Sequence, residues 1–157
     1  MYMEKKTCCV TGHREIAADK VEYVKRELRR EIAEAIGDNY THFLSGFADG
    51  ADVYFSEAVL ELKAEYPNIT LGAAIPYRKR LDKLHEDVRT RALLAGCSEI
   101  NIYSGEYFSG CFMKRNRAMV QASERVIAVH DGRDGGGTVF TMREASILQR
   151  DLRIIRI

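Results

Sequence analysis

The sequence has no long apolar run and almost no excess charge. None of its apolar runs approaches the roughly 20 residues of a membrane-spanning helix, so no membrane partner is expected. Lys and Arg total 24 against 23 Asp and Glu, a net charge of +1. This balance disfavours nucleic acid as a partner, although a local basic patch stays open. The N-terminal stretch MYMEKKTCCVTGHRE has only a short apolar run that ends in a turn, which is not a signal peptide, so we expect a cytoplasmic protein.

Paired cysteine motifs are also missing, since none of the four cysteines forms C-x-x-C. Without zinc-like spacing we expect no metal site. Cys8 and Cys9 are neighbours on a predicted strand, so their side chains should point to opposite faces. We interpret the cysteines as reduced, buried small hydrophobes; they are Cys8, Cys9, Cys97 and Cys111.

Proline is rare, with 2 in 157 residues, and short apolar segments alternate with longer amphipathic ones. The predicted strands are 7–11, 41–44, 69–75, 99–103, 125–129 and 152–157. The predicted helices are 18–36, 51–66, 79–95, 112–122 and 138–149, and Gly37 stands where a helix C-terminal glycine is expected. This alternation predicts a single α/β domain over 1–157. We expect a three-layer sandwich with a mainly parallel sheet of five to six strands.

Glycine-bearing loops follow four of the first five predicted strands. In open α/β sheets, ligands bind at the carboxyl ends of the strands near the topological switch point. Several such loops on one edge are better explained by a ligand that approaches the backbone than by separate turns. The candidate ligand-binding residues are Gly12, His13, Arg14, Ser45, Gly46, Asp49, Gly50, Asp52, Pro76, Tyr77, Asn116, Arg117, Asp131, Gly135, Gly136, Gly137 and Thr138.

The glycines at 135–137 precede a predicted helix, an arrangement typical of phosphate binding. They leave N–H groups unpaired at the positive end of the helix dipole. Thr138 either caps that helix or gives its hydroxyl to a phosphate, and Arg14 can add a bidentate contact. Asp49 and Asp52 would repel a phosphate, so they suit ribose hydroxyls or helix capping. Neither G-x-G-x-x-G nor G-x-x-x-x-G-K-[ST] is present, which argues against a standard dinucleotide site or an ATPase P-loop.

Other side chains near this edge each have two interpretations. His13 can contact a phosphate, act as an acid–base group or hold structure. The basic run 78–80 is interpreted as a solvated helix face, whereas the cluster 114–117 opens a helix after an edge loop and is expected to face the ligand. Four aromatic residues can stack on a base or simply pack; they are Tyr77, Tyr103, Tyr107 and Phe108.

Four segments carry a resemblance to a known family: TGHR at 11–14, SGFADGADVYFSE at 45–57, YSGEYFSGCFMKRNRAMV at 103–120 and DGRDGGGTVFTMREA at 131–145. They resemble the YpsA-like family of the SLOG superfamily, which also contains LOG-type phosphoribohydrolases and the Smf/DprA DNA-processing proteins. The resemblance implies a Rossmann-like fold and a site for a nucleotide or nucleotide-derived ligand. It also implies a link to bacterial cell division and stress, so a protein partner in one of these processes is one possibility. A homo-oligomer is another.

The catalytic pattern of the LOG-type hydrolases is incomplete in this sequence. Those enzymes carry an Arg-Lys pair in M-x-x-R-K and a Glu in P-G-G-x-G-T-x-x-E. Here the Arg position is Asn116, followed by Arg117, and the Glu position is Thr141, with Glu144 one helical turn further. The resemblance therefore favours ligand binding, sensing or regulation over phosphoribohydrolase catalysis.

Three functions stay open, with no cofactor assigned. The favoured one is a sensor or regulator that binds a nucleotide or an ADP-ribose-like ligand. The alternative is a hydrolase of such a ligand, which would use Arg115 or Arg117 with Glu144 or Asp131 as acid–base partner. The second alternative is a single-stranded DNA-binding module, which would need a basic surface with stacking aromatics.

Overall fold

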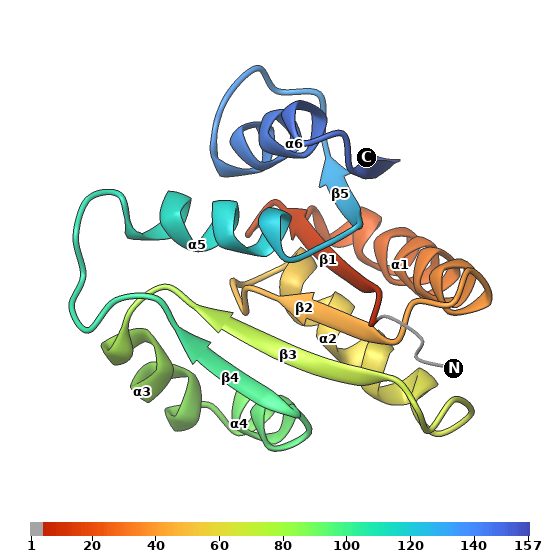
Figure 1. Cartoon of the computed structure of the whole chain (residues 1–157), viewed down its shortest axis with the longest axis horizontal. Coiled ribbons are helices and arrows are strands. Elements are labelled where there is room, and N and C mark those ends of the chain that lie inside the picture. Colours follow the sequence, from red (N-terminus) through yellow and green to blue (C-terminus); the bar gives the residue numbers. More distant parts are fainter. Residues whose placement is uncertain (1–4) are drawn as a thin grey trace.

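The computed structural model describes residues 5–157, whose six strands form one sheet in which every pairing is parallel (Figure 1). The strands are β1 (Thr7–Gly12), β2 (His42–Ser45), β3 (Thr70–Ile75), β4 (Glu99–Ile102), β5 (Arg125–His130) and β6 (Asp151–Arg156). Their order across the sheet is β4-β3-β2-β1-β5-β6. The prediction of a single parallel α/β sheet of five to six strands is confirmed.

Helices cover both faces of this sheet. They are the 3₁₀ turn η1 (Ala18–Lys20), α1 (Val21–Gly37), α2 (Ala51–Leu62), α3 (Arg78–Glu86), α4 (Val88–Ala95), α5 (Cys111–Gln121) and α6 (Gly137–Ile147). Cys8 packs in a core cluster with Val59 of α2, whereas the adjacent Cys9 packs in a second cluster with Met119 of α5 and Ala145 of α6. The two cysteines thus point to opposite faces, as predicted. None of the helices within residues 5–157 is long and apolar enough to cross a membrane.

All four cysteines are free thiols, and three of them are buried. Cys97 departs from the prediction because it is half-buried. Burial raises the pKa of Cys9 and of Cys97 to about 12, so both keep their protons at neutral pH.

The segment predicted as one helix over 79–95 is two helices, α3 and α4, and that prediction is wrong at Asp87. Asp87 has an extended backbone (φ −91°, ψ 128°) and its carboxylate accepts the N–H groups of Arg89 at 2.8 Å and Thr90 at 3.1 Å. It is therefore the N-cap of α4, and a new helix starts where the amphipathic pattern appeared to continue.

Two predicted helix ends also shift. α2 ends at Leu62, and the segment up to 66 forms a turn instead. Gly37 is the last residue of α1 and not the left-handed residue after it, which is Asn39 with φ 72°. Asn tolerates this conformation better than most residues, so a glycine is not needed there.

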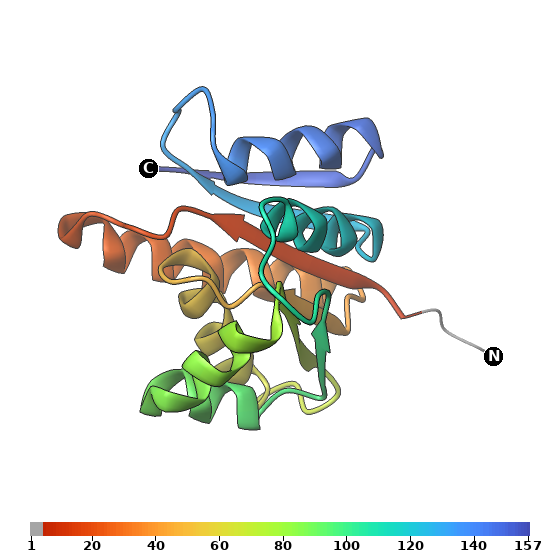
Figure 2. The same cartoon turned by 90° about the vertical axis from the view of Figure 1, so that its left-hand side faces the viewer.

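The chain reverses its course across the sheet after β4. It moves outward from β1 through β2 and β3 to β4, then crosses back to place β5 on the other side of β1. The topological switch point therefore lies between β1 and β5. The turned view in Figure 2 shows that β4 and β6 run in clearly different directions, which is the ordinary twist of a parallel sheet.

Candidate functional site

A cavity of about 390 Å³ lies at this switch point, and we call it the main cavity. The loop after β1, the start of α2 and the first turns of α5 and α6 line it. Its residues are Val10, Thr11, Gly12, His13, Arg14, Glu15, Ala48, Asp52, Phe112, Arg115, Asn116, Arg133, Gly137 and Thr138. This volume falls within the roughly 300–1,000 Å³ that small-molecule sites occupy.

Two glycines let the walls of the main cavity approach one another. A Cβ on Gly12 would lie 2.4 Å from that of Ala51, so α2 packs directly against the end of β1. Gly50 has φ 76°, and a Cβ there would lie 2.5 Å from the carbonyl oxygens of both His13 and Arg14. Both glycines are explained by packing between the loops after β1 and β2, because close backbone contact leaves no room for a side chain.

Arg115 forms the floor between the strand ends. Its side chain is 4% exposed. Its Nη1 donates to the carbonyl oxygens of Gly46 at 2.7 Å and Ala74 at 3.1 Å, and its Nε donates to Asn116 Oδ1 at 2.8 Å. Burial lowers the pKa of Arg115, and the nearby Asp52 carboxylate opposes that shift. The guanidinium is thus a fixed positive charge at the bottom of the site.

Asp52 is the buried acid of the main cavity. Burial raises the pKa of Asp52 to about 6, outweighing Arg115 and the N–H of Ala48, which donates to Oδ2 at 3.2 Å. A Cβ on Gly46 would lie 2.8 Å from Arg115 Nη1 and 2.9 Å from Asp52 Oδ2, so only glycine fits between the two charges. Ser45 is fully buried and donates to the Asp52 carbonyl oxygen, so its hydroxyl supports this arrangement.

The N-terminus of α6 opens into the main cavity at Gly137 and Thr138. The N-cap is Gly136, with φ 101°, and no side chain within residues 5–157 caps this end. Thr138 lies inside the first turn, so of its two predicted roles the structure excludes helix capping, and the contact with a phosphate stays a prediction. Gly135 and Gly136 lie in open space outside the lining, which leaves Gly137 as the member of the glycine run at the cavity.

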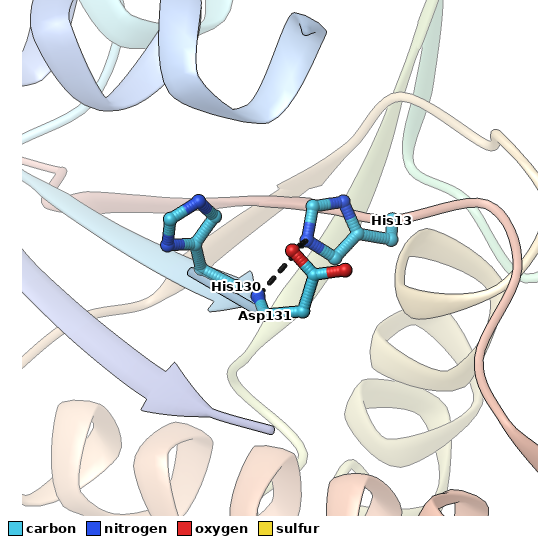
Figure 3. A group of neighbouring side chains, drawn as sticks. All are labelled: His13, His130 and Asp131. Carbon is cyan, nitrogen blue, oxygen red and sulfur yellow. Dashed lines mark hydrogen bonds and ion pairs between the residues drawn. The ribbon is translucent and has the colours of Figure 1, made fainter. Parts of the chain in front are cut away.

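His13 joins the loop after β1 to the end of β5. Its Nε2 lies 3.0 Å from the backbone N of Asp131 and 3.1 Å from Asp131 Oδ1, and Figure 3 shows this nitrogen turned toward Asp131. The backbone N–H of Asp131 can donate only to an unprotonated Nε2, whereas the Asp131 carboxylate favours a protonated Nε2. Burial lowers the pKa of His13, with Asp131 opposing, so the neutral ring that accepts the N–H prevails.

His13, His130 and Asp131 also bring three metal-ligating atoms within 4.8 Å of one another (Figure 3). Each of them already has a partner in the protein. His130 Nε2 lies 3.0 Å from the carbonyl oxygen of Arg133. The Arg133 guanidinium donates to both oxygens of Asp131 and holds the pKa of that carboxyl well below its usual range.

A second, smaller hollow of about 130 Å³ adjoins the main cavity, and we call it the arginine pocket. Arg14 and Phe112 line both spaces, and the Arg14 guanidinium lies over the Phe112 ring at 4.9 Å from its centroid. The arginine pocket is lined by Arg14, Gly46, Ala48, Asp49, Pro76, Tyr77, Arg80, Phe112 and Arg115.

The remaining candidate catalytic residues lie elsewhere. Arg117 and Glu144 are paired with each other across α5 and α6, with Nη2 3.4 Å from Oε1, and neither lines the main cavity or the arginine pocket. Thr141 is 2% exposed and donates its hydroxyl to the carbonyl oxygen of Gly137 at 2.9 Å. The position of the LOG-type glutamate is therefore engaged in the first turn of α6.

Several lining residues were not among the predicted site residues, notably Arg80, Phe112 and Arg133. Arg80 belongs to the run that we interpreted as a solvated helix face, yet it lines the arginine pocket. Its position on the first turn after β3 was the available signal. Phe112 and Arg133 flank predicted positions, and only the fold shows that they face the cavity.

The chain is similar to known proteins in sequence and in fold. A family model, YpsA, described as the YspA SLOG family, matches residues 8–155. A UPF0398 protein of Bacillus pumilus (strain SAFR-032) is 24% identical over 129 residues, which are 80% of this chain and 69% of that protein. A UPF0398 protein of Brevibacillus brevis is 22% identical over 127 residues, or 78% of this chain and 68% of that one.

Two solved structures share the fold. DNA processing protein A from Helicobacter pylori, whose structure is described in terms of single-stranded DNA binding, superposes with a TM-score of 0.65 at 20% identity. The match covers 95% of this chain but only 64% of that one. A structural-genomics target superposes with a TM-score of 0.57 at 18% identity and covers 94% of this chain and 72% of that one.

Proposed function

This chain belongs to the YpsA family of SLOG proteins, and on that premise we propose that it binds a nucleotide or a nucleotide derivative in the main cavity. In this proposal it acts as a ligand sensor or regulator without phosphoribohydrolase activity. The observation that carries the proposal is the lining at the switch point. There, the uncapped first turn of α6 shares one cavity with the guanidinium groups of Arg14, Arg115 and Arg133.

These groups suit an anion in the main cavity. A helix N-terminus offers N–H donors and a positive dipole end to a phosphate, and arginine adds charge-assisted hydrogen bonds. The Asp52 carboxylate, which lies close to Arg115, is ionised for the most part at neutral pH, because its pKa is about 6. We assign this carboxylate to the ribose hydroxyls, because it can accept hydrogen bonds from them, whereas it would repel a phosphate.

The replacement Gly137→Val is expected to abolish nucleotide binding while leaving the fold intact. A Cβ at Gly137 would meet only Asn116 Nδ2, at 3.8 Å, and Gly137 does not have positive φ, so the larger side chain fills the cavity without backbone strain. A nucleotide at 100 times its Kd should stabilise the wild type by about 2.7 kcal/mol. That corresponds to a Tm rise of roughly 5–11 °C for a domain of this size, which should vanish in the variant.

Gly135→Val is the matched control, because Gly135 lies in open space outside the cavity lining. It should keep the full nucleotide-induced rise in Tm. A Gly137→Val protein that also keeps the full rise would exclude the first turn of α6 as the phosphate site.

The hydrolase alternative makes a different prediction, and we expect it to fail. Arg117 and Glu144 bind each other outside the main cavity, so no acid–base pair of the LOG type faces a bound nucleotide. Chromatography of a nucleoside monophosphate incubated with the protein should therefore show no release of base at ordinary enzyme rates. A kcat of about 1–10³ s⁻¹ that is lost in Glu144→Ala would establish the hydrolase instead.

The DNA-binding alternative is favoured by one observation, the fold shared with DNA processing protein A. Tyr107, which packs against Tyr77 of the arginine pocket, and Phe108 are 62% and 44% exposed, so their rings are accessible for stacking on bases. Titration with oligodeoxythymidine at 50 and 200 mM salt separates the two functions. Affinity that falls steeply with salt and is not competed by free nucleotide would favour the DNA-binding module.

A further inference from the structure

We propose that the arginine pocket is a second anion subsite, which binds a second phosphate group of the ligand held in the main cavity. The ligand would then be a nucleotide derivative that carries more than one phosphate, such as a nucleoside bisphosphate or a diphosphate-linked nucleotide. This inference rests on the proposed nucleotide function and narrows its substrate class.

The arginine pocket presents three guanidinium groups from three separate elements. Arg14 follows β1, Arg80 lies in the first turn of α3, and Arg115 comes from α5. Arg80 is held in place because its Nη2 donates to the carbonyl oxygen of Phe47 at 3.0 Å. Arg14 is oriented by stacking on Phe112. The groups are thus positioned before any ligand arrives, which lowers the entropic cost of binding.

The charges in the arginine pocket are unbalanced. Against three guanidinium groups its lining has one carboxylate, Asp49, whose side chain is 78% exposed and whose Oδ1 lies 3.8 Å from Arg80 Nη2. Such a solvent-exposed ion pair does little to neutralise the charge of Arg80. Burial is the main cause that lowers the pKa of Arg115, and the Asp52 carboxylate opposes it. Repulsion from the Arg14 and Arg80 guanidinium groups lowers this pKa further. An anion bound among the three arginines would remove this repulsion.

Size and position make the arginine pocket part of a larger site. At about 130 Å³ it lies below the roughly 300–1,000 Å³ of pockets that hold a whole small molecule, whereas the main cavity falls within that range. Part of its lining is aromatic, with the Tyr77 ring edge-on to Phe112 at 6.0 Å, and Tyr107 packs edge-on to Tyr77 at 5.5 Å. Such apolar rings lower the local dielectric constant, which strengthens the attraction between the arginines and a phosphate.

The test compares AMP with adenosine 3′,5′-bisphosphate, ADP and ADP-ribose by isothermal titration calorimetry on the wild type, Arg80→Ala and Lys79→Ala. In the wild type, at least one ligand with a second phosphate should bind at least 10-fold tighter than AMP. Arg80→Ala should remove that gain and leave the affinity for AMP unchanged. Lys79→Ala removes the same charge from the neighbouring exposed position of α3 and should keep the gain.

Each outcome decides the matter. If AMP binds and no second phosphate adds affinity, or if the gain survives in Arg80→Ala, the subsite is excluded while the proposed function stands. If none of the four ligands binds, the proposed function fails together with the subsite. A gain lost equally in Lys79→Ala would reflect the general positive field of α3 and would also overturn the subsite.

Discussion

Replacing Arg115 by methionine is expected to lower the free energy of unfolding at neutral pH by about 3–5 kcal/mol. The Tm should fall by roughly 6–20 °C, at about 2–4 °C per kcal/mol. Methionine fills a similar length but leaves the Asp52 carboxylate buried without its cation. It also removes the donor to the carbonyl oxygens of Gly46 and Ala74. Urea unfolding followed by circular dichroism measures the loss.

Arg117→Met is the matched control for this experiment, two positions away on α5. Its guanidinium is about half exposed and pairs with Glu144 at the surface, so its loss should cost no more than about 1 kcal/mol. Arg115→Met should also lose less stability at pH 4 than at pH 7.5, because a protonated Asp52 needs no counter-charge. Equal losses in the two variants would mean that Arg115 has no special structural role.

Replacing Asp52 by asparagine is expected to change how stability depends on pH. The pKa of Asp52 is raised in the folded protein from the ordinary 3.8 to about 6, so the folded state binds this proton more tightly than the unfolded state. The stability that Asp52 contributes is full below about pH 4 and is lost as the pH rises through about 6. A shift of this size is worth about 3 kcal/mol. Asparagine does not titrate, so the variant does not lose this stability as the pH rises. The stability of Asp52→Asn relative to wild type should therefore rise by about 3 kcal/mol between pH 4 and pH 7.5.

Urea unfolding of wild type and Asp52→Asn at pH 4 and pH 7.5 measures this difference. Taking the difference between the two proteins cancels titrations that they share. The same substitution at Asp49, whose side chain is 78% exposed, is the control. A stability difference between wild type and Asp52→Asn that is the same at both pH values would show that Asp52 is not a buried, destabilised carboxylate.

The fold could be predicted because its signals are local. Alternating apolar strands and amphipathic helices specify a parallel sheet without knowledge of any long-range contact. The one helix that was predicted wrongly, over 79–95, fails for a local reason as well. Asp87 can continue an amphipathic helix or cap a new one, and only packing on both sides decides between them.

The site could be predicted less well, because it depends on which way each side chain turns. Arg115, Asn116 and Arg117 are consecutive in one basic cluster, yet the first two face the main cavity and the third pairs with Glu144 outside it. Each helical residue turns about 100° from the last, so a cluster does not reveal its inner face. The predicted glycines follow strand ends on one edge, but the sequence does not distinguish Gly12, where a side chain would collide with Ala51, from Gly137, where the cavity leaves room for one.

The reversal of strand order has a consequence for the order in which the protein is made. His13 and Asp131, whose hydrogen bond joins the loop after β1 to the end of β5, are 118 positions apart in the chain. During synthesis, β1 can pair with β2 early, but its other edge waits for β5, and contacts at such separation slow folding. Until then β1 is an exposed edge strand that invites aggregation. Because residues from both ends of the chain line the main cavity, it is complete only after β5 has joined β1.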